Sequence, residues 1–226
     1  MFRQFVRDNL AMVAALFIVA AGVLVFGKLA SEVMDGDTAA FDRTLILMLR
    51  DGSQGLRPIG PIWFQEMVRD FSALGSFGVL TLVVLFSFTY MLMIDQRGSA
   101  LLLVSAVLSG QLLSSGLKLV FDRSRPDIVS HITQEFTASF PSGHAMMSAV
   151  TYLTIGALMT RTTHDLHVRL FMVSVSLVLT VLVGASRVYL GVHWPTDVLA
   201  GWTVGAAWAM LCWSVALKLQ RGGTMN

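Results

Sequence analysis

Two histidines in the C-terminal half of the chain lie beside residues that could direct their chemistry. Asp197 follows His193 by four residues, and Pro195 between them favours the start of a helix. A carboxylate at this spacing can hold one imidazole nitrogen as N–H and leave the other with an exposed lone pair, as a nucleophile requires. His144 is predicted at the N-terminal end of another helix, where it can protonate a leaving oxygen. The pattern indicates a nucleophile and a general acid.

Three cations accompany these histidines. Lys118 and Arg125 are seven residues apart, or two helical turns, so they share a face if their helix continues to Pro126. Arg187 adds a third cation, and Asp197 is the only carboxylate expected to be buried with them. Guanidinium groups fit phosphate oxygens in particular. This excess of positive charge predicts a site for a phosphate group.

The segment 141–144 offers the anion further donors. Pro141 and Gly143 leave backbone N–H groups free at the positive end of a helix, and Gly143 allows close approach. Ser142 can cap that helix or donate its hydroxyl to the anion. No carboxylate cluster or His/Cys spacing suited to a metal ion lies near these residues. We therefore expect phosphoryl transfer that relies on the cations, with no metal and no other cofactor.

The composition indicates where such a site must be held. Only 13% of the 226 residues are charged, 55% are hydrophobic and the mean hydropathy is +0.70. A soluble domain carries about 25% charged residues, so this chain is predicted to be an integral membrane protein. The single cysteine, Cys212, excludes a disulfide scaffold. A net charge of +2 without a Lys/Arg run gives no indication of a nucleic-acid partner.

Six apolar stretches can each cross a hydrocarbon core about 30 Å thick. They predict an all-α fold: an integral membrane bundle of six transmembrane helices, in a single domain over residues 1–226, with the catalytic motifs within 118–197. Both termini then lie on one side. The first stretch could instead be a cleaved signal peptide, because Arg3 and Arg7 precede it. The predicted spans are 9–27, 72–94, 98–117, 142–160, 170–186 and 198–217.

The connections between the spans bring the motifs together. The longest runs from about 29 to 71, and its apolar stretches 44–49 and 62–71 predict short interfacial helices, with Trp63 and Phe64 at headgroup depth. Short turns elsewhere place the end of span three, the start of four, the end of five and the start of six on one side. Ionisable groups at a helix centre in the membrane cost about 2.5–3.5 kcal/mol each, and those that persist usually serve a function.

Other polar and small residues are interpreted as structural. Arg123 and Asp122 are expected on the loop surface, with a phosphate contact as the alternative. Gly201 and Gly205 favour close helix packing within the bundle over a dimer seam. Three further histidines are expected in solvated loops: His131, His164 and His167.

Lysine and arginine counts do not decide the orientation. The side with both termini has seven of these residues and the other side has nine, so a raw positive-inside count would place the termini outside. However, Lys118, Arg125 and Arg187 are better explained by chemistry, which weakens the count.

The motifs resemble those of a known family. Lys118-x6-Arg125-Pro126, Pro141-Ser142-Gly143-His144 and Ser186-Arg187-x5-His193-x3-Asp197 are similar, in order and without departure, to the three motifs of the type-2 phosphatidic acid phosphatase superfamily, which also includes vanadium haloperoxidases. The resemblance implies a six-helix membrane lipid phosphatase that acts without metal through a phosphohistidine. It implies His193 as nucleophile, Asp197 as its partner and His144 as general acid. The phosphate-binding residues would be Lys118, Arg125, Ser142, Gly143 and Arg187.

The expected reaction removes the terminal phosphate of a membrane lipid phosphate or diphosphate. Undecaprenyl diphosphate is the first expected substrate, from what similar bacterial enzymes do, followed by phosphatidylglycerophosphate and phosphatidate. Dephosphorylation of lipid A, lipid-to-lipid phosphotransfer, halide oxidation and a non-catalytic lipid-binding scaffold are the alternatives. The resemblance also implies a bacterial inner membrane and a site that faces the periplasm. The oligomeric state and the physiological substrate stay open.

Overall fold

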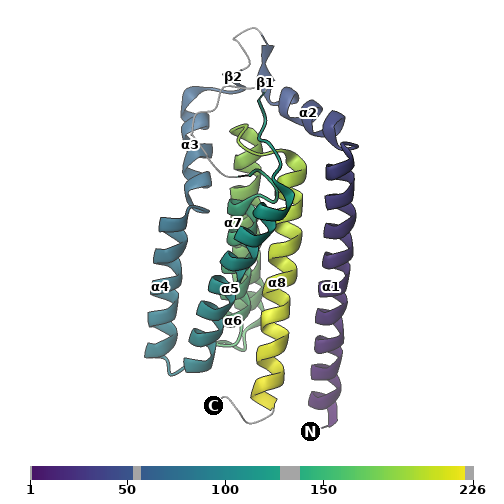
Figure 1. Ribbon diagram of the computed structural model, residues 1–226. Coiled ribbons are helices and arrows are strands. Elements are labelled where there is room, and N and C mark those ends of the chain that lie inside the picture. Colours follow the sequence, from purple (N-terminus) through teal and green to yellow (C-terminus); the bar gives the residue numbers. More distant parts are fainter. Residues whose placement is uncertain (1, 53–56, 128–137, 222–226) are drawn as a thin grey trace.

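The computed structural model describes residues 2–52, 57–127 and 138–221, and these are mostly helical (Figure 1). Two strands of two residues each, β1 (Arg50–Asp51) and β2 (Arg57–Pro58), pair antiparallel and were not predicted. The helices are α1 (Phe2–Asp35), α2 (Ala39–Met48), α3 (Ile62–Ala73), α4 (Phe77–Met93), α5 (Arg97–Phe121), α6 (Gly143–Met159), α7 (Leu166–Tyr189) and α8 (Pro195–Arg221).

The described helices confirm a membrane bundle but not the number of spans. Four helices contain stretches long and apolar enough to cross a membrane: Met12–Asp35, Arg97–Phe121, Leu166–Tyr189 and Pro195–Val215. Taken together, α3 and α4 would make a fifth span, although the chain bends by 54° between them. With 17 residues, α6 is shorter than these four stretches. Six transmembrane helices are therefore not confirmed.

The predicted span 72–94 starts later than expected: α4 begins at Phe77, residues 72 and 73 belong to α3, and the chain breaks between the two helices. Ser76 caps α4 by accepting a hydrogen bond from the N–H of Val79 at 3.4 Å. Gly75, in the break, lies so close to Val183 of α7 that a side chain at this position would overlap it. The break allows α3 to pack against α7 while α4 packs against α5.

Close packing of small residues holds α6 at the centre of the bundle, against α5, α7 and α8. A Cβ atom on Gly201 would lie 2.7 Å from the carbonyl oxygen of Ser142, and one on Gly205 would lie 2.5 Å from that of Met146. These two glycines therefore pack α8 on α6, which confirms the predicted packing within the bundle. Against the other face of α8 lies α1, where a Cβ on Gly22 would lie 2.9 Å from the Cβ of Ala207.

The outward surface of the bundle is apolar. On α4, Phe77 and Met93 are each 79% exposed, and Leu119 of α5 is 85% exposed. Such a surface suits hydrocarbon, in which the helices satisfy their own backbone hydrogen bonds. The two short helices expected in the long first connection are present as α2 and α3, and Trp63 of α3 is exposed.

Four helix ends meet at one end of the bundle, as predicted. The end of α5, the start of α6, the end of α7 and the start of α8 lie beside α2 and the two strands, at the top of Figure 1. The first residues of α1 and the last of α8 lie at the opposite end (Figure 1). His164 and His167 are exposed near the turn between α6 and α7, as expected. The prediction for His131 falls outside the described residues.

Candidate active site

His193 and Asp197 form a buried pair at the start of α8, which begins at Pro195 as predicted. His193 Nδ1 lies 3.4 Å from Asp197 Oδ2, and the two side chains are 1% and 0% exposed. The same carboxylate oxygen accepts a hydrogen bond from the backbone N–H of Trp194 at 2.9 Å. The turn of chain before α8 thus folds onto the carboxylate and brings the imidazole with it.

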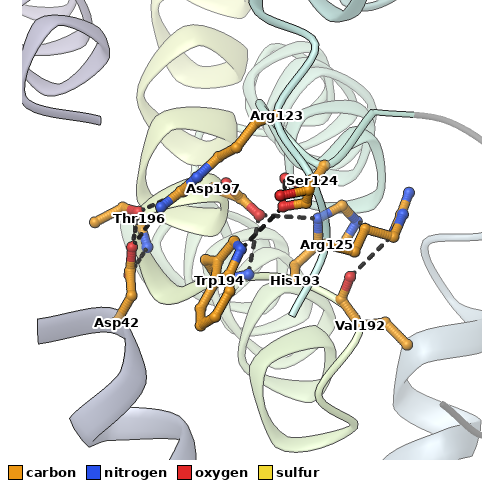
Figure 2. Close-up of polar contacts among 10 residues, drawn as sticks. Asp42, Arg123, Ser124, Arg125, Val192, His193, Trp194, Thr196 and Asp197 are labelled. Carbon is orange, nitrogen blue, oxygen red and sulfur yellow. Dashed lines mark hydrogen bonds and ion pairs between the residues drawn. The ribbon is translucent and has the colours of Figure 1, made fainter. Parts of the chain in front are cut away.

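Arg125 defines the protonation of this imidazole. Its Nη1 lies 3.2 Å from His193 Nε2 and donates to the carbonyl oxygen of Val192 at 2.8 Å (Figure 2). A guanidinium can only donate, so Nε2 must accept and carry the lone pair. The proton of a neutral ring then lies on Nδ1, where it faces Asp197. This is the tautomer that a nucleophilic Nε2 needs.

Arg123 is not a loop-surface residue, so that expectation was wrong. Its side chain is only 15% exposed, and Nη1 donates to Asp197 Oδ1 at 2.6 Å. Nη1 also donates to the hydroxyl of Thr196 at 2.9 Å, and the guanidinium lies 5.7 Å from the centre of the Trp194 ring. Arg123 is largely buried because it pairs with two carboxylates, Asp197 and a second one in α2. These contacts join distant parts of the chain, so the local sequence does not show them. The neighbouring Asp122 is exposed, as expected.

Asp42 is the second of those carboxylates, and sequence reasoning missed it. It lies in α2, is 0% exposed and receives Arg123 Nη2 on Oδ2 at 2.8 Å. The expectation that Asp197 is the only buried carboxylate at this end was therefore wrong. The available signal was an acidic residue at the edge of the apolar stretch 44–49.

Lys118 and Arg125 do not share a helical face, because α5 ends at Phe121. Asp122 takes the left-handed conformation with φ 32°, which turns the chain out of the helix. The proline after Arg125 disfavours helix at the preceding residue, which is consistent with an early end. The two cations approach the site from different directions: Lys118 from the last turn of α5, and Arg125 from the loop that follows.

The N-terminal end of α6 lies beside Lys118. A Cβ on Gly143 would lie 3.6 Å from both Cε and Nζ of Lys118. Ser142 precedes the helix and makes no side-chain cap, and its buried hydroxyl has no hydrogen-bond partner among the described residues. Its backbone N–H donates to the carbonyl oxygen of Asp197 at 2.9 Å, which joins the starts of α6 and α8. An orphaned hydroxyl, an ammonium group and free N–H groups of a helix end suit an anion.

His144 and Arg187 lie where the α3–α4 break meets the end of the bundle. A Cβ on Gly75 would lie 3.3 Å from His144 Cδ2. Arg187, at the end of α7, is 3% exposed, and its Nη1 donates to the hydroxyl of Ser72 at 2.9 Å. Thus Ser72 of α3, outside the motifs, supports the third cation, and Gly75 in the break lies beside the second imidazole.

Arg50 of β1 is a further buried cation at this end, 7% exposed, which donates from Nη1 to the carbonyl oxygen of Leu49 at 3.0 Å. Burial lowers the pKa of this guanidinium and the hydroxyl of Tyr189 opposes that change. Arg50 stays charged at neutral pH because arginine does not deprotonate in proteins.

Among the residues described, no group of three His, Cys, Asp or Glu side chains is placed to hold a metal ion. The Arg125 guanidinium, 3.2 Å from His193 Nε2, brings positive charge to one of the imidazoles.

An apolar helix bundle with an Asp-paired imidazole and several cations at one end is the arrangement expected of a membrane phosphatase. The chain belongs to the PAP2 superfamily, whose family model matches residues 99–221. This range covers α5 from Ser99 onward, α6 to α8 and all three motifs. The chain is therefore a membrane lipid phosphatase of this superfamily, which confirms the family expected from the motifs.

Two curated proteins are similar in sequence. Phosphatidylglycerophosphatase B of Bacillus subtilis (strain 168) is 34% identical over 144 residues, which is 63% of this chain and 70% of that protein. Undecaprenyl-diphosphatase of Sulfolobus acidocaldarius is 41% identical over 68 residues, which is 30% of this chain and 29% of that protein.

Two crystal structures are similar in fold. A transmembrane PAP2-type phosphatidylglycerolphosphate phosphatase from Bacillus subtilis has a TM-score of 0.80 and 27% identity, covering 91% of this chain and 98% of that one. LpxE of Aquifex aeolicus has a TM-score of 0.55 and 24% identity, covering 77% of this chain and 93% of that one, and it supports the fold alone.

Proposed function

We propose that this chain hydrolyses the terminal phosphate of a membrane lipid through a phosphohistidine on His193, without a metal ion. The observation that carries the proposal is the position of His193 between two opposite partners. Its Nδ1 faces Asp197 at 3.4 Å and its Nε2 faces Arg125 at 3.2 Å. One partner fixes the proton, and the other can bring a phosphate group to the lone pair.

The proposed reaction has two steps. In the first, Nε2 of neutral His193 bonds to phosphorus, the P–O bond to the lipid breaks, and the departing oxygen takes a proton from His144. In the second, His144 accepts a proton from water, the resulting hydroxide bonds to phosphorus, and the P–N bond breaks to release phosphate. Asp197 stabilises the positive charge that the His193 ring carries between the steps. Proposed phosphate ligands are Lys118, Arg125, Ser142, Gly143 and Arg187.

Phosphatidylglycerophosphate and undecaprenyl diphosphate are the two substrates proposed first. The relative with the longer sequence match, and the structure with a TM-score of 0.80, are both phosphatidylglycerophosphatases. The shorter match is to an undecaprenyl-diphosphatase. Undecaprenyl diphosphate is also the first substrate expected from the sequence. In both lipids the bond that breaks joins the terminal phosphorus to its bridging oxygen, so the proposed residues could act on either substrate.

The proposal includes a setting in the membrane. We propose that residues 1–226 form one domain with six spans, in which α6 is the span enclosed by the others and α3–α4 is a broken span. The site would face the periplasmic side of a bacterial inner membrane. The substrate's apolar tail would stay in the bilayer while its headgroup reaches the end of the bundle.

A panel assay tests the proposal. Purified protein and the His193→Ala variant are given phosphatidylglycerophosphate, phosphatidate and undecaprenyl diphosphate, and free phosphate is measured. We expect release by the parent and a loss of at least about 1,000-fold in the variant, as for other removed nucleophiles. Equal rates in the two proteins would refute the mechanism. Radiolabelled phosphate that appears on a second lipid instead of in solution would indicate the phosphotransferase.

A further inference from the structure

Asp42 lies in α2, outside the family motifs, yet its carboxylate is completely buried against the start of α8 (Figure 2). Oδ1 accepts from the backbone N–H of Thr196 at 2.9 Å. Oδ2 accepts from the hydroxyl of Thr196 at 2.6 Å and from Arg123 Nη2 at 2.8 Å. Burial of an ionised carboxylate costs several kcal/mol unless such donors offset it. These three donors join α2 to the first turn of α8.

Arg123 continues this connection to the proposed nucleophile. While Nη2 pairs with Asp42, Nη1 lies 2.6 Å from Asp197 Oδ1. Asp197 Oδ2 in turn faces His193 Nδ1. Figure 2 shows the guanidinium of Arg123 between the two carboxylates. A continuous series of polar contacts therefore runs from Asp42 through Arg123 and Asp197 to the imidazole of His193.

We propose that Asp42 and Arg123 are positioning residues that hold Asp197, and through it His193, in the reactive orientation. The proposal rests on the function of His193 proposed above. Without Arg123, Asp197 would lose the guanidinium that pairs with Oδ1 and would keep weaker partners, among them the N–H of Trp194 and the imidazole of His193 on Oδ2, so the carboxylate could rotate. A misplacement of about 1 Å at a reacting group can cost about 100-fold in rate. Asp42 fixes Arg123 and needs no contact with phosphate.

The charges of this cluster support the same role. On the Nδ1 side of His193, two carboxylates and the guanidinium of Arg123 leave a net charge of −1, while Arg125 lies on the Nε2 side. The imidazole gains positive charge when Nε2 bonds to phosphorus while Nδ1 keeps its proton. A fixed negative charge in a buried place stabilises that state more than the neutral ring that precedes it. Loss of the charge of Asp42 should therefore slow the chemical step and leave lipid binding unchanged.

The first test is Asp42→Asn in the full-length protein, with phosphate release from phosphatidylglycerophosphate measured over a range of lipid concentrations. The amide keeps the size of the side chain and removes the charge opposite Arg123. We expect kcat to fall by about 10- to 100-fold with KM unchanged. We expect a similar fall for Arg123→Lys, which keeps the positive charge but loses the planar guanidinium that contacts both carboxylates. Asp37→Asn, at an exposed residue near the start of α2, is the matched control and should behave as the parent.

The double variant separates positioning from a general loss of structure. If Asp42 acts through Arg123, then Asp42→Asn together with Arg123→Lys lowers kcat no further than the worse single variant. The proposal would be overturned if the losses of kcat in the two single variants multiply in the double variant. It would also be overturned if either folded single variant changes KM alone, or keeps a kcat within threefold of the parent. If Asp42→Asn does not fold, as judged by thermal unfolding, the kcat and KM of Arg123→Lys decide. His193→Ala is assayed in parallel: full activity there refutes the proposed function, whereas an inactive His193→Ala beside a fully active Asp42→Asn refutes only the positioning.

Discussion

Arg125 Nη1 lies 3.2 Å from His193 Nε2, and this contact joins the loop after α5 to the turn before α8. The lone pair proposed to attack phosphorus therefore points at a guanidinium. A phosphate group held by Arg125 would come within reach of Nε2. The contact thus places the proposed anion ligand and the proposed nucleophile in one arrangement, although 68 positions separate them in the sequence.

Replacement of Arg125 by lysine should impair catalysis strongly. A lysine ammonium donates from one point, so it cannot hold the Val192 carbonyl and a phosphate oxygen together as the fork of Arg125 can. We expect kcat/KM for phosphate release to fall by about 100-fold, the usual effect of a lost donor to a transition-state oxygen. Arg69→Lys is the control, because Arg69 pairs with Glu66 on the exposed surface of α3 and should tolerate the change. Parent-like rates for Arg125→Lys would remove Arg125 from the site.

An added methyl group at Gly143 should weaken phosphate binding without unfolding the protein. The new Cβ would meet Lys118 Cε and Nζ at 3.6 Å, an ordinary contact distance. The methyl group would nevertheless occupy space at the helix end where we propose that phosphate approaches the backbone N–H groups. We expect Gly143→Ala to raise KM by about tenfold, since each 1.4 kcal/mol of lost binding is a factor of ten.

The matched control for this change is Gly116→Ala, in the last two turns of α5, where an added Cβ has nothing within 4 Å. Alanine favours helix over glycine, so this variant should be as stable as the parent or slightly more so, with unchanged kinetics. If Gly143→Ala also leaves KM unchanged, the proposed approach of phosphate at the start of α6 is incorrect.

The motif residues and the helices could be predicted from sequence because both depend on local patterns. Apolar stretches of about 20 residues indicate spans, and Pro195 indicates the start of a helix that carries Asp197. These features need no knowledge of distant residues. The structure accordingly places His193 beside Asp197, and the ends of four helices together, as the sequence predicts.

The contacts of Asp42 could not be predicted in this way. It lies 81 positions from Arg123 and 154 from Thr196, and only the packing of α2 against the start of α8 brings them together. From sequence, Arg123 could only be assigned to the loop surface. The break between α3 and α4 has a similar origin, because the close approach of Gly75 to Val183 is a tertiary contact. Hydropathy places the start of the span at Ser72, five residues before α4, because an apolar stretch alone does not show where the chain bends.

Gly205 should be needed for the separation of α6 and α8. A Cβ at this position would lie 2.5 Å from the carbonyl oxygen of Met146 and 2.7 Å from the Cβ of Ala149, so the helices would have to move apart. We expect Gly205→Ala to destabilise the protein by about 1–3 kcal/mol, as overpacked cores do. Thermal unfolding in detergent measures the change. Gly27→Ala, on the exposed face of α1 with nothing within 4 Å, should not lower the unfolding temperature. Equal unfolding temperatures would show that α8 can shift on α6 at little cost.

Removal of divalent metal ions should leave the activity intact. We propose that Lys118, Arg125 and Arg187 supply the positive charge that a metal ion otherwise supplies to the oxygens of a transferring phosphate. Protein dialysed against excess chelator, and assayed for phosphate release with metal-free lipid, is therefore expected to keep its rate within about twofold. A metal-dependent phosphatase treated in the same way confirms that the chelator acts. A clear loss of activity that added Mg²⁺ restores would contradict the proposed mechanism, because side-chain cations would then not suffice for the reaction.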